Sequence, residues 1–186
     1  GVEKNAARAT LLLYAAAMRG SVHAMKELEA MAEASGVRHG AVLFGQRLDT
    51  ANRTAMRDTL SRAGMQPSDI GYINAHGTST PLGDKAETLA VKAVFGGRES
   101  APPMSSTKSA TGHLMGAGGL TEAIACIKAI EEGVLPPTLH LAKPDPECDL
   151  DYVPNTARKA EINAAMSNSL GFGGQNSSLI VAKYER

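Results

Sequence analysis

Two histidines and a lysine lie in short polar segments of the chain that could share one pocket. His76 belongs to the segment Asn74–Thr80, and both Lys108 and His113 belong to Ser105–His113. A neutral histidine can donate a ring N–H to a carbonyl oxygen that becomes an enolate or a tetrahedral oxyanion. A nearby ammonium group favours the neutral form of a histidine and stabilises the developing anion. These residue types therefore point to chemistry at a carbonyl group, provided that the fold brings them together.

A third polar segment, Asn168–Gly174, is rich in glycine. Each of the three segments follows a predicted strand, and sites in open α/β sheets form beyond the carboxyl ends of strands. We therefore expect the three segments to converge on one pocket. We also expect Glu122, in the helix that follows the second segment, to pair with Lys108 and to fix its position.

Strands and helices alternate along the chain before a closing pair of strands. Periodicity and turn residues predict strands at 41–44, 69–75, 102–106, 164–169 and 178–183, and helices at 21–34, 51–62, 83–95 and 113–132. This alternation favours a layered α/β domain over a helical bundle. The helix from His113 is expected to be the longest and to be mostly buried, because its apolar residues occupy much of its circumference. These apolar residues are Leu114, Met115, Leu120, Ile124, Ile127 and Ile130.

The composition excludes several classes of protein. The 186 residues suffice for one substantial domain, and 19 basic residues balance 19 acidic ones. Nucleic-acid binders normally carry a basic excess, so that class is excluded. Two cysteines cannot form a disulfide framework, which is typical of a cytoplasmic protein. The apolar run Leu11–Met18 is too short to span a bilayer, and we interpret it as an amphipathic or buried helix.

Three motifs carry a resemblance to a known family. His76–Thr80, Lys108–His113 and Gly171–Gly174 occur in the order found in the C-terminal half of a β-ketoacyl-acyl carrier protein synthase, a type II elongating condensing enzyme of the thiolase fold. The resemblance extends from about Ala55 to Arg186. It implies an α/β fold that is thiolase-like, the C-terminal half with a mixed sheet flanked by helices. We predict a poorly matched leader and linking segment at 1–50 and the C-terminal β-ketoacyl synthase domain at 51–186.

The resemblance implies an acyltransferase. The expected reaction is the decarboxylative Claisen condensation of an acyl thioester with malonyl-acyl carrier protein, in fatty-acid or polyketide elongation. His76 and His113 match the catalytic histidines, which hold the thioester carbonyl and stabilise the enolate formed on loss of carbon dioxide. Lys108 matches the supporting catalytic lysine, and Glu122 matches its salt-bridge partner.

The resemblance also implies how substrate is bound. Thr78 and Thr80 fall where hydroxyls bind the pantetheine arm, and Phe172 matches a gating phenylalanine. No cofactor of the chain's own is expected, because phosphopantetheine arrives on the acyl carrier protein, and no metal site is expected. Asp84 and Glu87 are interpreted as carboxylates on a helix surface or facing a helix dipole, without a catalytic role.

The chain departs from the family at the nucleophile. The family's cysteine lies in the N-terminal half, and no such segment occurs here. Cys126 is interpreted as a small core residue in a helix, and Cys148 as a structural residue in a proline-rich loop. An alternative function is therefore a catalytically silent partner or scaffold subunit of a condensing enzyme, similar to a chain-length factor.

The family fold pairs two similar halves, so an isolated C-terminal half should expose an apolar face. We therefore expect a homodimer or an association with an N-terminal half, in addition to the acyl carrier protein. Without the other half, we expect the chain to be inactive in condensation.

Overall fold

The computed structural model describes residues 40–171 and 175–184. The chain divides into two units, Gly1–Leu48 and Asp49–Arg186, and side-chain positions are described only in the second. The apolar run at 11–18, the helix predicted at 21–34 and Phe172 lie outside the described residues.

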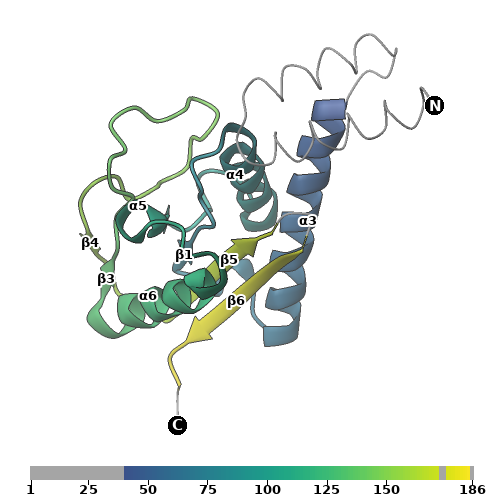
Figure 1. Ribbon diagram of the computed structural model, residues 1–186. Coiled ribbons are helices and arrows are strands. Elements are labelled where there is room, and N and C mark those ends of the chain that lie inside the picture. The colour runs from purple at the N-terminus through teal and green to yellow at the C-terminus, as the bar shows by residue number, and fades with distance from the viewer. Residues whose placement is uncertain (1–39, 172–174, 185–186) are drawn as a thin grey trace, which may run out of the picture. The chain divides into compact units, whose positions relative to one another are not determined.

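Helices and strands alternate through the described residues (Figure 1). The α-helices are α3 (Gly40–Ala63), α4 (Pro81–Phe95), α5 (Lys108–Thr111) and α6 (Gly118–Glu132), with 3-10 turns at Pro67–Asp69 and Met115–Ala117. The strands are β1 (Tyr72–Asn74), β2 (Met104–Ser105), β3 (Val134–Leu135), β4 (Arg158–Lys159), β5 (Ala164–Leu170) and β6 (Asn176–Ala182). None of the described helices is long and apolar enough to cross a membrane.

The main sheet is mixed, as predicted. Its strand order is β2-β1-β5-β6, in which β1 runs parallel to β2 and β5 while β6 runs antiparallel to β5. In this register Ile73 lies opposite both Met104 and Met166, and Asn168 lies opposite Ser178. A small antiparallel sheet of β3 and β4 was not predicted.

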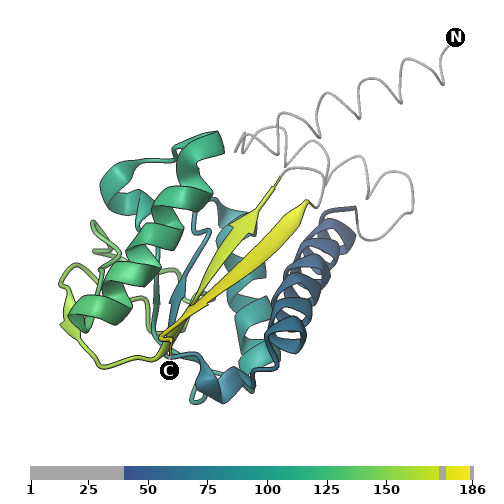
Figure 2. The same cartoon turned by 90° about the horizontal axis from the view of Figure 1, so that it is seen from below.

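Helices cover both faces of the main sheet (Figure 2). Successive side chains of a strand point to opposite faces, so Ile73 joins the core with α3 and α4 while Tyr72 joins the core with α6. The first core contains Met56, Leu60, Ile70, Ala75, Ala90, Val91, Phe95, Met104, Leu150, Ala164 and Met166, and the second contains Cys126, Ala129, Ile130, Leu135, Val153, Ile162 and Ala165. The predicted layered α/β domain is therefore confirmed.

The strand predicted at 41–44 is wrong. These residues belong to α3, which starts at Gly40 and continues through the helix predicted at 51–62. A helix satisfies its backbone hydrogen bonds within its own segment, whereas a strand needs a neighbour. A run of four apolar residues next to a good helical sequence therefore extends the helix.

The helix predicted from His113 begins only at Gly118, and α3 is the longest helix of the described residues. Positive φ angles at Gly112 (74°) and Met115 (50°) are incompatible with a continuous α-helix.

The prediction that this helix is mostly buried is also wrong. Five of its six predicted apolar residues are between 40% and 70% exposed, and Ile130 alone is buried. The five are Leu114, Met115, Leu120, Ile124 and Ile127. The helix α6 packs on the sheet with one face only, which confirms that this half exposes an apolar face.

Candidate active site

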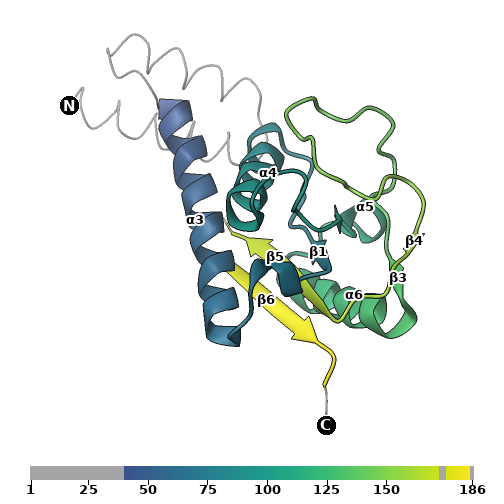
Figure 3. The ribbon, with the colours of Figure 1, turned by 180° about the vertical axis from the view of Figure 1, so that it is seen from behind.

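Two of the three polar segments meet at the carboxyl ends of β1 and β2. His76 lies two residues after the end of β1, and Lys108 begins the short helix α5 after β2. A cavity of about 600 Å³ lies between these segments and the loop that contains Thr138, Leu139 and Cys148. Figure 3 shows this loop passing beside α5. The predicted convergence is present for these two segments, because parallel strands end at the same edge of the sheet.

The two histidine rings are in edge-to-face contact beside the cavity, which His113 lines. Their centroids are 5.6 Å apart and their planes are inclined by 85°. The Met115 backbone N–H donates to Nδ1 of His113 over 3.2 Å, so a neutral His113 carries its proton on Nε2. The positive φ of Met115 belongs to the turn that makes this bond possible. His113 therefore presents a ring N–H donor.

His76 is held in its neutral form. Burial first, and then the positive charge of Lys108 and the neighbouring His113, together lower the pKa of His76 to about 4. A neutral imidazole keeps one N–H for donation and does not attract an anionic group by charge. Ring N–H donors beside an ammonium group can stabilise negative charge that develops on a substrate oxygen.

Lys108 and Glu122 form a buried ion pair, as predicted. The side chains are only 7% and 4% exposed, and Lys108 Nζ donates to Glu122 Oε1. Lys108 lies on α5 and Glu122 on the buried face of α6, so the pair joins these two helices. The carboxylate fixes the ammonium group close enough to His76 to affect its pKa.

Glu87 was misplaced by the sequence interpretation, which put it on a helix surface. It is 2% exposed, and its carboxylate accepts the backbone N–H groups of His76 and Gly77, each over 3.0 Å. Asn168 Nδ2 donates to the same carboxylate over 3.2 Å. Burial raises the pKa of Glu87, and these three hydrogen bonds oppose the rise. Glu87, on α4, therefore fixes the backbone of the loop at His76 and Gly77.

Gly77 ties the two segments together. Ser106 Oγ donates to the Gly77 carbonyl over 2.6 Å, and Gly77 has a φ of 38°. A Cβ atom at this position would lie 2.6 Å from Ser106 Cβ. Close approach of the two backbones thus requires glycine here.

The hydroxyls expected to bind substrate line the cavity. Thr78 and Thr80 both contribute to its wall, and their Oγ1 atoms are 3.2 Å apart. Asp84 lies in the first turn of α4, and burial raises its pKa while the backbone groups of residues 78–80 and the charge of Lys108 oppose the rise. Its interpretation as a carboxylate facing the helix dipole agrees with this position.

The two cysteines differ in position. Cys126, a residue of α6, is fully buried in the core, as predicted, and burial raises its pKa to about 12. Cys148 is half-buried and lines the cavity, and burial raises its pKa as well. Neither thiol is held as a thiolate, the form that attacks carbonyl carbon. Among the described residues, no group of three or more His, Cys, Asp or Glu residues could hold a metal ion.

Comparison with known sequences identifies the family. The chain matches the family model described as β-ketoacyl synthase, C-terminal domain, over residues 29–142. The 3-oxoacyl-[acyl-carrier-protein] synthase 2 of Staphylococcus aureus (strain COL) is 52% identical over 131 residues, which are 70% of this chain and 32% of that protein. The chain thus spans about a third of the length of this relative. Because the family match begins at residue 29, the boundary at residue 50 stays a prediction.

Solved structures show the same fold. The ishigamide ketosynthase/chain length factor has a TM-score of 0.67 and 42% identity, covering 70% of this chain and 32% of that one. A type II polyketide acyl-carrier protein in complex with its ketosynthase, AntDE:AntF, has a TM-score of 0.68 and 37% identity, covering 72% and 33%. The predicted thiolase-like fold is confirmed. The chain belongs to the β-ketoacyl synthase family and carries its C-terminal domain.

Proposed function

We propose that this chain supplies the histidine and lysine half of the active site of a condensing enzyme in fatty-acid or polyketide elongation. The observation that carries the proposal is the edge-to-face contact of the His76 and His113 rings, together with the buried ion pair of Lys108 with Glu122. Family membership and the ketosynthase relatives support the reaction class.

In the proposed reaction, a malonyl thioester places its carbonyl oxygen between the two imidazoles. The bond between the α-carbon and the carboxylate breaks, carbon dioxide leaves, and the electron pair moves to the thioester oxygen as an enolate. Ring N–H groups of His76 and His113 stabilise this oxyanion, and Lys108 adds a positive field. The enolate carbon then attacks an acyl thioester on a cysteine outside this chain, a C–C bond forms, and the cysteine leaves as thiolate.

The proposed substrate arm enters through the cavity. Hydroxyls of Thr78 and Thr80 are placed to accept and donate hydrogen bonds to the amides of a phosphopantetheine arm, which an acyl carrier protein would bring. The role of Phe172 as a gate stays a prediction. The complex of AntDE:AntF supports a carrier protein as the partner, and no resident cofactor is proposed.

The apolar face of α6 is the proposed contact with the rest of the enzyme. Leu120, Ile124 and Ile127 recur at helical spacing on this exposed face. The remaining two-thirds of the relatives' length supplies enough chain to cover it. A second copy of this chain is the other candidate, since the same stripe can pack against itself about a twofold axis.

A silent partner is the second candidate function. The raised pKa values of Cys126 and Cys148 favour it, and one relative is a ketosynthase with a chain length factor. The upstream reading frame separates the two candidates: a cysteine in a strand-to-helix turn there favours the enzyme, and a stop codon just before residue 1 favours the silent partner.

The proposal is tested by release of carbon dioxide from malonyl-acyl carrier protein, with this chain coexpressed with the N-terminal part of the S. aureus relative. His76→Ala and His113→Ala should each lower the rate by about a hundred- to thousandfold. Lys108→Ala should also lower it, whereas Cys126→Ser should leave it nearly intact. The chain alone should show no condensation. A dead Cys126→Ser together with wild-type activity of His113→Ala would refute the assignment.

A further inference from the structure

A chain of hydrogen bonds links β6 to the His76 loop. Ser178 Oγ donates to Asn168 Oδ1 over 2.8 Å, and Asn168 Nδ2 donates to Glu87 Oε1 over 3.2 Å. Glu87 in turn accepts the backbone N–H groups of His76 and Gly77. We propose that Ser178 is a positioning residue for His76, acting through Asn168 and Glu87.

The side-chain amide of Asn168 needs both Glu87 and Ser178 to keep a single orientation. It is 1% exposed, and its amide can be placed in two ways that differ by exchange of oxygen and nitrogen. The observed placement turns the NH₂ group to the Glu87 carboxylate and to Met56 Sδ (3.6 Å), and turns the oxygen to the Ser178 hydroxyl. The opposite placement would set two acceptors against each other at Glu87. Without the hydroxyl, the amide oxygen would be buried and unpaired, which is costly.

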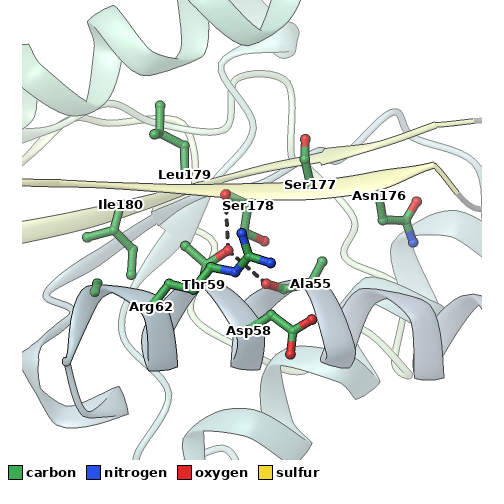
Figure 4. Close-up of a pocket in the computed structure, with 10 residues that line it drawn as sticks. Ala55, Asp58, Thr59, Arg62, Asn176, Ser177, Ser178, Leu179 and Ile180 are labelled. Atoms are coloured by element: carbon green, nitrogen blue, oxygen red, sulfur yellow. Dashed lines mark hydrogen bonds between the residues drawn. The ribbon is translucent and has the colours of Figure 1, made fainter.

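The backbone of Ser178 also contacts α3. The Thr59 hydroxyl can donate its one proton to either of two carbonyl oxygens, that of Ala55 over 2.8 Å or that of Ser178 over 3.1 Å (Figure 4). A cavity of about 450 Å³ lies along this junction of α3 and β6. Ser178 lies directly opposite Asn168 in the register of β5 and β6. The pairing of β5 with β6 therefore brings the Ser178 side chain within reach of Asn168.

The neighbouring residue provides a matched control. Ser177 is the same residue type on the same strand, but its side chain is exposed and points to the other face of the sheet. Its replacement alters strand propensity as much as replacement of Ser178 does. It touches no atom of the path to Glu87 among the described contacts.

Loss of the Ser178 hydroxyl should loosen the backbone at His76. If Ser178 loses its hydroxyl, Asn168 no longer presents a fixed N–H to Glu87, and the carboxylate is less firmly oriented toward the two backbone N–H groups. The role of His76 in a reaction rests on the proposed function, but the hydrogen-bond path does not.

The test is hydrogen exchange at the amides of His76 and Gly77, measured by NMR on the full 186-residue chain. Ser178→Ala should speed exchange at both amides by roughly fivefold, which corresponds to loss of one neutral hydrogen bond. Ser177→Ala should leave both rates unchanged, and Ser178→Thr, which keeps the hydroxyl, should match wild type. Glu87→Gln should give the largest acceleration. Exchange at Ala165 in β5 serves as the reference.

Several results would overturn the proposal. These are unchanged exchange in Ser178→Ala, equal acceleration at Ala165, an effect of Ser177→Ala of the same size, or a Ser178→Thr variant that behaves like alanine. If Ser178→Ala fails to fold, Ser178→Cys keeps the volume with a weaker donor and should give a smaller acceleration in the same direction. No substrate is needed, so these outcomes are independent of whether the chain takes part in condensation.

Discussion

At the scale of single residues, the site combines a histidine that is kept neutral with a lysine that stays charged. His76 is kept neutral by burial and by the positive charge of Lys108, while Lys108 keeps its buried position through Glu122. A neutral imidazole and a fixed ammonium are complementary, because the first donates a hydrogen bond and the second supplies the field. Their pairing has measurable consequences for stability.

The low pKa of His76 makes folding depend on pH. An unfolded histidine binds a proton near pH 6.5, whereas folded His76 binds it at about 4. Between these values the unfolded chain holds more protons, so the free energy of unfolding should fall as the pH drops from 6.5 to 4. The expected loss is on the order of 2 kcal/mol, below the full value because the ring is partly exposed.

This dependence is measured by urea unfolding at several pH values, with wild type compared to His76→Asn at each. The comparison is needed because the pKa of Glu87 is raised in the folded chain. This raised pKa increases the free energy of unfolding as the pH falls, which opposes the effect of His76. NMR titration of the His76 ring gives the pKa directly, and a midpoint at or above 6.5 would contradict the prediction.

The buried pair of Lys108 and Glu122 should be costly to break from one side. Lys108→Met leaves a buried carboxylate without its partner and should lower the free energy of unfolding by about 3–5 kcal/mol. Lys108→Met combined with Glu122→Leu should recover much of that loss. The exposed pair of Lys128 and Glu131 is the control, where a single replacement should lower the free energy of unfolding far less, because solvent screens the two charges. Urea unfolding of the single and double variants measures these changes in the free energy of unfolding. Equal losses at the buried and the exposed pair would refute the prediction.

At the scale of elements, the site depends on how closely two loops approach. Gly77→Ala combines an unfavourable positive φ with a contact of 2.6 Å to Ser106 Cβ. Gly64 also has a positive φ, but a Cβ atom there meets nothing within 4 Å. Gly64→Ala should therefore cost about 1 kcal/mol, and Gly77→Ala about 3 kcal/mol or more. Thermal or urea unfolding of both variants measures the difference, and equal costs would mean that the loops can separate freely.

Local signals in the sequence predicted some elements well. The helix expected at 83–95 was found at Pro81–Phe95, because proline is favoured at the first helical position and Gly96 ends the helix in a left-handed conformation. The helix expected from His113 failed at its beginning, since the turn at Met115 has a positive φ that no propensity predicts. The strand expected at 41–44 failed because a short apolar run is compatible with either structure.

The candidate site was predicted in part. The motifs placed His76, His113, Lys108 and Glu122 together, and the structure brings these four residues to one place. Glu87 was missed because its burial depends on how α4 packs on the sheet. The link from Ser178 was missed for a similar reason, since only the pairing of β5 with β6 sets it opposite Asn168. Such contacts between distant segments leave no pattern in the sequence.

At the scale of the whole molecule, the apolar face of α6 should drive association. Ile124→Asp places a charge in the middle of this face and should weaken association with a second copy or with the N-terminal part of a relative by at least tenfold. Leu89→Asp is the matched control, because Leu89 is an equally exposed apolar residue on α4. Sedimentation velocity over a range of concentrations measures both. A wild-type chain that stays monomeric and binds no N-terminal part would contradict the prediction.

The position of β6 at the end of the main sheet has a consequence for handling the protein. An uncovered outer strand is a template on which other chains can add in register, and this is how fibrous aggregates begin. Residues 177–182 read Ser-Ser-Leu-Ile-Val-Ala, without charge or proline, and among the described residues no strand pairs with the outer edge of β6. Lys183 follows as the nearest charge. Concentrated solutions of this chain should therefore form thioflavin-positive material more readily than those in which the strand is covered.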